Sequence, residues 1–150
     1  MTTITHPTET AAVTTRWITW LCLWIYGVIA FSALGLVWEG ISGDLFTWVV
    51  FGETATPAAF SAEAVDYQRL IFTIVCAVTI GWMLLLLAVV RTPLRGGERW
   101  AWTAAVTSVA TWYVVDSTFS IALGYPENAV LNSLFVAGFV PPLVALRSAP

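Results

Sequence analysis

Four apolar stretches, each long enough to cross a lipid bilayer, occupy most of this 150-residue chain. They cover residues 17–38, 62–90, 98–123 and 127–146. Roughly 20 apolar residues in a helix span a bilayer, and a helix satisfies its backbone hydrogen bonds internally. Only 10% of the residues are charged, whereas soluble domains carry roughly 25%. The pattern predicts an all-α integral membrane protein with one four-helix bundle over residues 16–150.

The segments outside these stretches are short. Residues 1–15 are polar and rich in threonine, without a periodic apolar face, and we expect a flexible cytoplasmic tail. In the connection after the first span, Asp44 is a suitable N-cap and Gly52 a suitable end for a short interfacial helix near 44–51. In the last span, Pro141 and Pro142 should bend or end the helix.

The arginines are distributed unequally between the two ends of the predicted bundle. One end holds Arg16, Arg91, Arg95, Arg99 and Arg147, and the other holds only Arg69. Because cytoplasmic loops carry the excess of basic residues, both termini and the 91–99 loop are expected in the cytoplasm. All basic residues are arginine, and the usage suggests a bacterium with a GC-rich genome. We therefore expect a multi-pass protein of the bacterial inner membrane.

One carboxylate, that of Asp116, is expected inside the membrane. It lies about 24 Å along its helix from Trp100, in the outer third of the bilayer. A charge there costs roughly 2.5–3.5 kcal/mol unless it is paired, protonated or hydrated. Side chains expected at a similar depth are Arg69, Asn132, Glu39, Ser120 and Asn128.

Two interpretations of this polar cluster stay open. It is either a site for a proton, a cation or a ligand entering from outside, or an Arg69–Asp116 pair that fixes helix register together with Asn132. The structural interpretation is favoured, because the cost of a charge falls toward the interface.

Three of the nine tryptophans are expected near mid-bilayer: Trp24, Trp82 and Trp112. Their flat rings can form a wall for a quinone, a carotenoid or another apolar ligand. They can also be packing residues opposite strips of small side chains, which we favour. These strips are Thr73/Ala77/Gly81, Ala104/Ser108 and Ala129/Ser133/Ala137.

Several chemistries are disfavoured by what the sequence lacks. Without lysine no retinal Schiff base can form, and the one histidine, His6, lies outside the spans, which argues against haem. The net charge of −3 argues against nucleic acid. No metal-ligand spacing, phosphate-binding glycine loop or other catalytic motif is present.

Three function hypotheses remain. The favoured one is a non-catalytic accessory or assembly subunit of a membrane complex, which interacts with the bilayer and with other membrane subunits or its own copies. The alternative is an oligomeric transporter, channel or small-ligand carrier that uses the outer polar cluster around Asp116, since a single four-helix bundle fills its own core. The third is a membrane enzyme that acts on a lipid or a quinone.

Overall fold

The computed structural model describes residues 7–38, 44, 47–48, 52 and 60–147, and from residue 14 onward it also describes their side chains. This part of the chain is all-α. It contains α1 (Pro7–Val37), α3 (Ala62–Val89), α4 (Arg99–Ala122) and α5 (Pro126–Leu146), with a π-helical turn, η1 (Val90–Leu94), directly after α3. The four long helices therefore lie where the apolar stretches predict them. Most of the predicted interfacial helix at 44–51 lies outside the described residues.

Local sequence signals explain several helix ends. Ser61 caps α3, because its Oγ accepts a hydrogen bond from the Ala64 backbone N–H at 3.3 Å. Pro126 occupies the first turn of α5, where its missing N–H has no consequence. Gly124 has a φ of +90°, which favours glycine and turns the chain between α4 and α5.

The start of α1 corrects the expected boundary of the N-terminal tail. The helix begins at Pro7, so residues 7–15, expected as flexible tail, continue the first span as helix. The ring of Pro7 presets a helical φ, and Ala11 and Ala12 have high helix propensity. A polar segment joined to a stable helix extends it without a second nucleation step.

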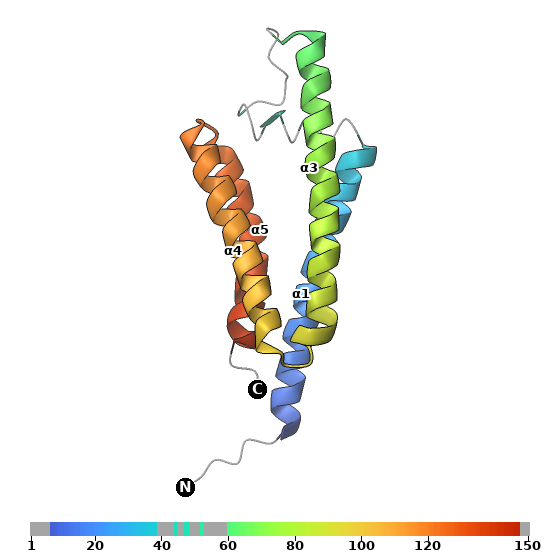
Figure 1. Ribbon diagram of the computed structural model, residues 1–150, viewed down its shortest axis with the longest axis vertical. Helices are drawn as coiled ribbons and strands as arrows, with labels where there is room; N and C mark the ends of the chain where they lie inside the picture. Colours follow the sequence, from blue (N-terminus) through green and yellow to red (C-terminus); the bar gives the residue numbers. More distant parts are fainter. Residues whose placement is uncertain (1–6, 39–43, 45–46, 49–51, 53–59, 148–150) are drawn as a thin grey trace.

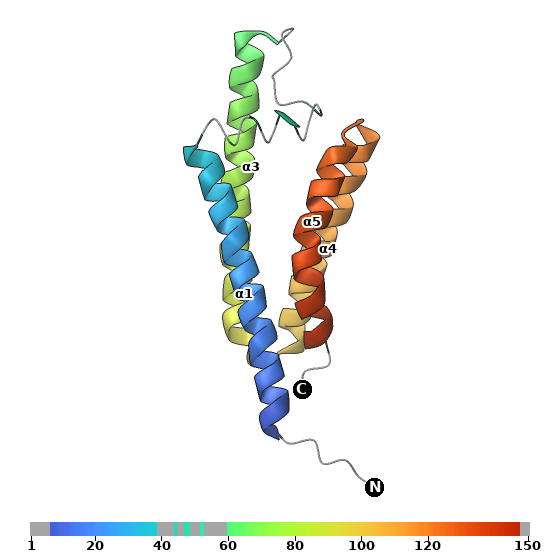
Figure 2. The ribbon, with the colours of Figure 1, turned by 180° about the vertical axis from the view of Figure 1, so that it is seen from behind.

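The helices form two antiparallel pairs, α1 with α3 and α4 with α5 (Figures 1 and 2). The pairs meet at the end that carries η1 and diverge toward the opposite end. We call the first the arginine end, because Arg91, Arg95, Arg99 and Arg147 lie there, and the second the acidic end, which holds Glu63, Asp66 and Glu127.

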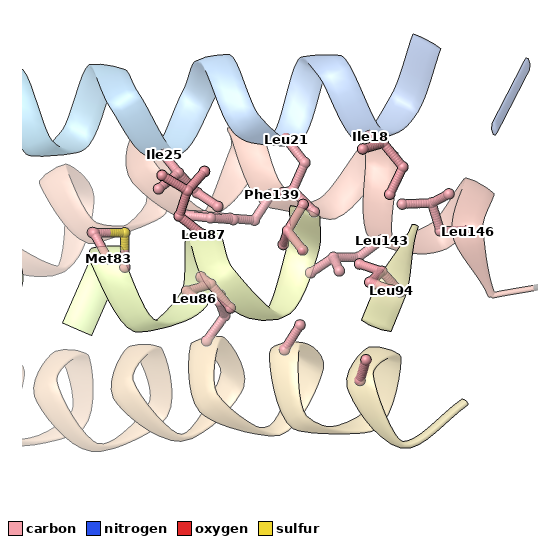
Figure 3. Packing of buried hydrophobic residues seen from close by; sticks show 14 of the residues in the cluster. Ile18, Leu21, Ile25, Met83, Leu86, Leu87, Leu94, Phe139, Leu143 and Leu146 are labelled. Atoms are coloured by element: carbon pink, nitrogen blue, oxygen red, sulfur yellow. The ribbon is translucent and has the colours of Figure 1, made fainter. Parts of the chain in front are cut away.

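The hydrophobic core fills the half of the molecule near the arginine end (Figure 3). Ile25, Met83 and Val90 are fully buried there, and Ala101 and Ala105 allow α4 to approach closely. Packing between the two helix pairs is therefore concentrated in this half of the molecule.

The outer surface of the bundle is apolar. Leu23, Leu85 and Val144 are 65%, 66% and 67% exposed, respectively. Three segments, Thr14–Val37, Ala62–Leu94 and Pro126–Leu146, are long and apolar enough to span a membrane. α4 has more serine and threonine and is less apolar than these three. The protein is thus a helical membrane protein with three spans shown by length and composition.

The two prolines in α5, expected to bend or end the helix, do not end it. α5 continues through Pro141 and Pro142 to Leu146. Pro142 has no N–H for the carbonyl of Gly138, four residues earlier. The indole N–H of Trp20 on α1 donates to this Gly138 carbonyl at 3.1 Å. A tryptophan from a neighbouring helix thus replaces the missing hydrogen bond.

A second tryptophan does the same at the C-terminal end of α5. The Arg147 N–H turns to the carbonyl of Val144 at 3.3 Å, which leaves the Leu143 carbonyl without its usual helical partner. The indole N–H of Trp102 on α4 donates to Leu143 O at 2.7 Å. Both interactions attach α5 to its neighbours where its own ladder is incomplete.

Candidate functional site: a cavity with one carboxylate

The structure brings four of the predicted polar residues together between α4 and α5. The Asn128 amide donates to Asp116 Oδ1 at 3.2 Å, and the Asn132 amide donates to Asp116 Oδ2 at 3.1 Å. The Ser120 hydroxyl donates to Asp116 Oδ1 at 3.3 Å and accepts from Asn128 at 2.8 Å. Each carboxylate oxygen therefore has at least one donor.

Helix periodicity explains why these side chains meet. Ser120 is one turn after Asp116 on α4, and Asn132 is one turn after Asn128 on α5. Two adjacent antiparallel helices, each with polar residues four apart, place them at one level. The same face of α4 also supplies Ser117, whose hydroxyl accepts from Asn132 at 3.3 Å. Sequence reasoning missed Ser117, although its position three residues before Ser120 was a usable signal.

The cluster is only partly buried, and each of the two helices contributes one buried side chain to it. Asn132 and Ser117 are only 4% and 8% exposed, whereas Asp116 is half-buried. All of the observed donors to the carboxylate are neutral amides or hydroxyls. Neutral donors stabilise a carboxylate but do not neutralise its charge.

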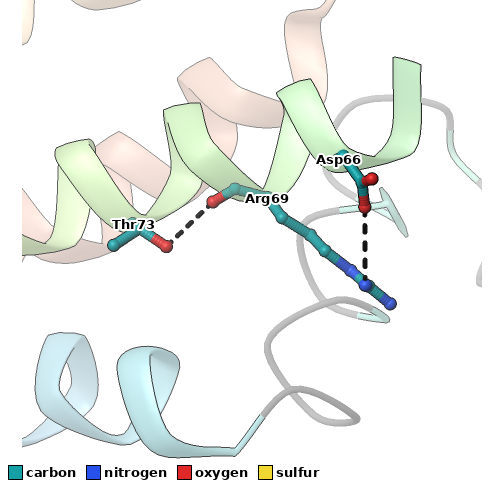
Figure 4. Close-up of polar contacts among 3 residues, drawn as sticks. All are labelled: Asp66, Arg69 and Thr73. Atoms are coloured by element: carbon teal, nitrogen blue, oxygen red, sulfur yellow. Dashed lines mark hydrogen bonds and ion pairs between the residues drawn. The ribbon is translucent and has the colours of Figure 1, made fainter. Parts of the chain in front are cut away.

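The expected pairing of Arg69 with Asp116 is wrong. Arg69 is highly exposed on α3, and its Nη1 lies 3.8 Å from Asp66 Oδ1, one turn earlier (Figure 4). The Thr73 hydroxyl donates to the Arg69 backbone carbonyl at 2.9 Å. A similar depth in the membrane does not give two side chains the same direction around their helix axes. Glu39, the other predicted acidic partner, lies outside the described residues.

A cavity of about 300 Å³ lies between the two helix pairs, and Asp116, Asn128 and Asn132 are part of its wall. Its other lining residues are mainly apolar and aromatic: Val28, Phe31, Ser32, Leu34, Gly35, Trp38, Phe72, Val75, Cys76, Thr79, Trp82, Met83, Trp112, Leu131, Phe135 and Phe139. All four long helices contribute to it. A cavity of this size, apolar with few polar groups, is typical of small-molecule sites.

The three mid-span tryptophans have two different environments. Trp82 and Trp112 line the cavity, with ring centroids 5.5 Å apart and a tilt of 52°. The Trp82 indole N–H donates to the Ser108 hydroxyl at 2.6 Å, which fixes the ring between α3 and α4. The predicted aromatic wall thus includes these two rings.

Trp24 packs against α5 instead of lining the cavity. Its indole N–H donates to the Phe135 carbonyl at 3.0 Å. A Cβ atom at Gly138 would lie 1.9 Å from Trp24 Cε2, so only glycine leaves room for this ring. The contacts of Trp24 are therefore those of a packing residue.

No protein-family model matches the chain, and neither a curated protein nor a solved structure shows significant similarity to it. Within the described ranges, no three His, Cys, Asp or Glu side chains gather in a way that would hold a metal ion.

Proposed function

We propose that this protein is a membrane-embedded binding protein or carrier for a small lipophilic cation. The ligand would be an ammonium group or a similar organic cation attached to an apolar body. One observation carries the proposal: a carboxylate whose partners among the described residues are all neutral lines a mainly apolar, aromatic cavity between the two helix pairs.

The charge of Asp116 supports a ligand role. Asn128, Asn132 and the serines can connect α4 to α5 by neutral hydrogen bonds, so helix packing alone does not require a carboxylate. A charge at the bilayer centre costs roughly 2.5–3.5 kcal/mol and less toward the interface, and a bound cation would offset the cost at the depth of Asp116. Among the described residues, no arginine or histidine lines the cavity and supplies that cation.

The aromatic rings favour an organic cation over a metal ion. Trp112 is one turn before Asp116 on α4, and both line the cavity. A cation within about 6 Å of a tryptophan ring is attracted to the ring face. Carboxylate and tryptophan together thus favour a cationic head, while Phe72, Phe135 and their neighbours accommodate an apolar body.

Membrane type and orientation complete the proposal. α4 has 24 residues, a length of about 36 Å, which is sufficient for a bilayer core of about 30 Å. It also lies beside α5, so we infer that α4 is a fourth span. The arginine distribution supports a bacterial inner membrane with both termini in the cytoplasm. The cavity would then lie toward the periplasmic side.

The test compares benzyltrimethylammonium with neopentylbenzene, in which carbon replaces the charged nitrogen. Each is titrated calorimetrically into the full chain in dodecyl maltoside, with protein-free micelles as the reference. We expect saturable binding of the cation, about tenfold tighter than binding of the hydrocarbon, because attraction of a cation to a tryptophan ring contributes roughly 0.5–2 kcal/mol and the charge of the carboxylate adds to it. Equal affinities would contradict the proposal.

Matched variants locate the site. Asp116→Asn keeps the shape of the side chain and should remove the preference for the cation. Glu127→Gln removes a carboxylate from the start of α5 that does not line the cavity, and should leave the preference unchanged. If both variants behave like the natural chain, the cation does not bind at Asp116.

An accessory or assembly subunit remains the second candidate. One observation favours it: the small residues Thr73, Ala77 and Gly81 are exposed on one face of α3, and no heavy atom lies within 4 Å of a Cβ at Gly81. Such strips allow another membrane helix to approach closely. A mass above the 16.3 kDa of one chain in mild detergent would support this candidate.

A further inference from the structure

A second cavity, also of about 300 Å³, lies at the arginine end and is separate from the Asp116 site. It is bounded by α1 and η1, and its lining residues are Thr15, Ile18, Thr19, Cys22, Leu23, Tyr26, Arg91 and Arg95. We infer that it binds the phosphate headgroup of an anionic phospholipid. This inference does not depend on the proposed cation site.

The local backbone places both guanidinium groups at this cavity. Pro93 interrupts the α-helical ladder, and the chain widens into the π-turn, where the Arg95 N–H donates to the Val90 carbonyl at 3.2 Å. The two arginines, four residues apart, both line the cavity beside α1. Arg91 Nη1 donates to the Tyr26 hydroxyl at 3.4 Å, which orients it over this space.

Their positive charge has no acidic partner among the residues whose side chains the structure describes, from residue 14 onward. The ion pair found there is Arg69–Asp66, at the other end of the molecule. Glu98, the nearest acid in sequence, accepts a hydrogen bond from the Trp100 indole N–H. Two uncompensated guanidinium groups favour a phosphate, whose oxygens match their paired donors.

The rest of the cavity favours a lipid over a free anion. Ile18, Cys22 and Leu23 give it an apolar wall, and Leu23 is 65% exposed on the outer face of α1, where an acyl chain would lie. The cavity also lies where the apolar segment Ala62–Leu94 ends, at the expected level of the headgroups. Basic pockets between helices at this level are typical sites for anionic lipid headgroups.

The experiment titrates dioleoyl-phosphatidylglycerol into the purified full chain and measures bound lipid by native mass spectrometry. Dioleoyl-phosphatidylcholine and inorganic phosphate are the comparison probes. We expect phosphatidylglycerol to bind at least tenfold tighter than phosphatidylcholine, and millimolar phosphate to leave its binding unchanged. Equal binding of the two lipids overturns the inference, and displacement by phosphate shows a free-anion site instead.

Charge-matched variants distinguish binding in this cavity from a general attraction of anionic lipid to the arginine end. Arg91→Gln with Arg95→Gln should weaken phosphatidylglycerol binding about 25-fold, which corresponds to about 1 kcal/mol for each arginine near an anionic lipid surface. Arg99→Gln with Arg147→Gln removes the same charge from the same end, away from the cavity, and should have less than a threefold effect. Equal effects of the two pairs overturn the inference.

A single substitution keeps the test valid if the double variant does not fold. Arg95→Gln leaves the hydrogen bond between Arg91 and Tyr26 in place and should weaken binding about fivefold. Unchanged binding in a folded Arg95→Gln protein contradicts the inference.

Discussion

At the residue scale, Gly138 determines how α1 meets α5. The Trp24 ring lies directly on the α5 backbone, and a Cβ at Gly138 would be 1.9 Å from Cε2 and 2.3 Å from Cδ2 of that ring. The ring cannot retreat without loss of its hydrogen bond to the Phe135 carbonyl. A single methyl group at this position would therefore separate the two helices.

We expect Gly138→Ala to lower the free energy of unfolding by about 3 kcal/mol, at the upper end of overpacking effects. Thermal unfolding in detergent, followed by circular dichroism, measures it. Gly81→Ala is the matched control, because nothing lies within 4 Å of its Cβ and alanine is the better helix former by roughly 0.5–1 kcal/mol. Similar destabilisation by both variants would show that the Trp24 contact is not responsible.

The candidate site was only partly predictable at this scale. Depth along each helix was enough to associate Asp116 with Asn132, Ser120 and Asn128, because residues four apart share a face. Depth gave no information on direction around the helix, so it could not exclude the Arg69–Asp116 pair of the structural interpretation, which the structure does not form. The real partner of Arg69, Asp66, lies one turn away on the same helix and required no tertiary contact.

At the scale of elements, α5 shows how a helix with two adjacent prolines stays continuous. Trp20 donates to the Gly138 carbonyl that Pro142 leaves without a partner, and Trp102 donates to the Leu143 carbonyl near the C-terminal end. An unsatisfied carbonyl is costly within a membrane, where water cannot replace the missing donor. Tryptophan suits this role because it brings one donor on a large apolar ring.

A double-mutant cycle tests this relation between Trp20 and Pro142. Trp20→Phe removes the indole N–H and should lower the free energy of unfolding by about 1 kcal/mol. In a Pro142→Ala background the alanine supplies its own backbone N–H to Gly138, so the same Trp20→Phe change should have a smaller effect. Thermal unfolding of the four proteins gives the coupling energy. Additive effects would exclude the compensation.

Helix positions were the most predictable feature of the fold. The expected span at 62–90 corresponds to α3 (Ala62–Val89), and that at 98–123 to α4 (Arg99–Ala122). The contacts between helices were not predictable in the same way. Lipid and core are both apolar, so a membrane helix is hydrophobic around its whole circumference and its pattern does not mark the face that packs. Trp20 and Trp102 illustrate this, because nothing in the sequence marks them as the residues that donate to α5.

At the scale of the whole molecule, the divergence of the two helix pairs divides the protein into two halves along its long axis. The core between Ile18 and Leu146 joins the pairs at the arginine end, while the Asp116 cavity occupies the region where they diverge. One half therefore holds the bundle together, and the other contains the cavity. This division is relevant to transport only if α4 crosses the membrane, so that the arginine end and the acidic end lie on opposite sides.

Cysteine labelling tests this arrangement in one experiment. Glu98→Cys and Tyr125→Cys lie at opposite ends of α4, and each is introduced where the free cysteines Cys22 and Cys76 are replaced by serine. Neither change removes an arginine, so the charge asymmetry that sets orientation is retained. In intact bacterial cells, a membrane-impermeant maleimide should label the Tyr125→Cys protein and should reach the Glu98→Cys protein only after permeabilisation. If α4 lies along the surface, both cysteines will be on one side and will label alike. Labelling of Glu98→Cys alone in intact cells would show that the arginine end faces outward.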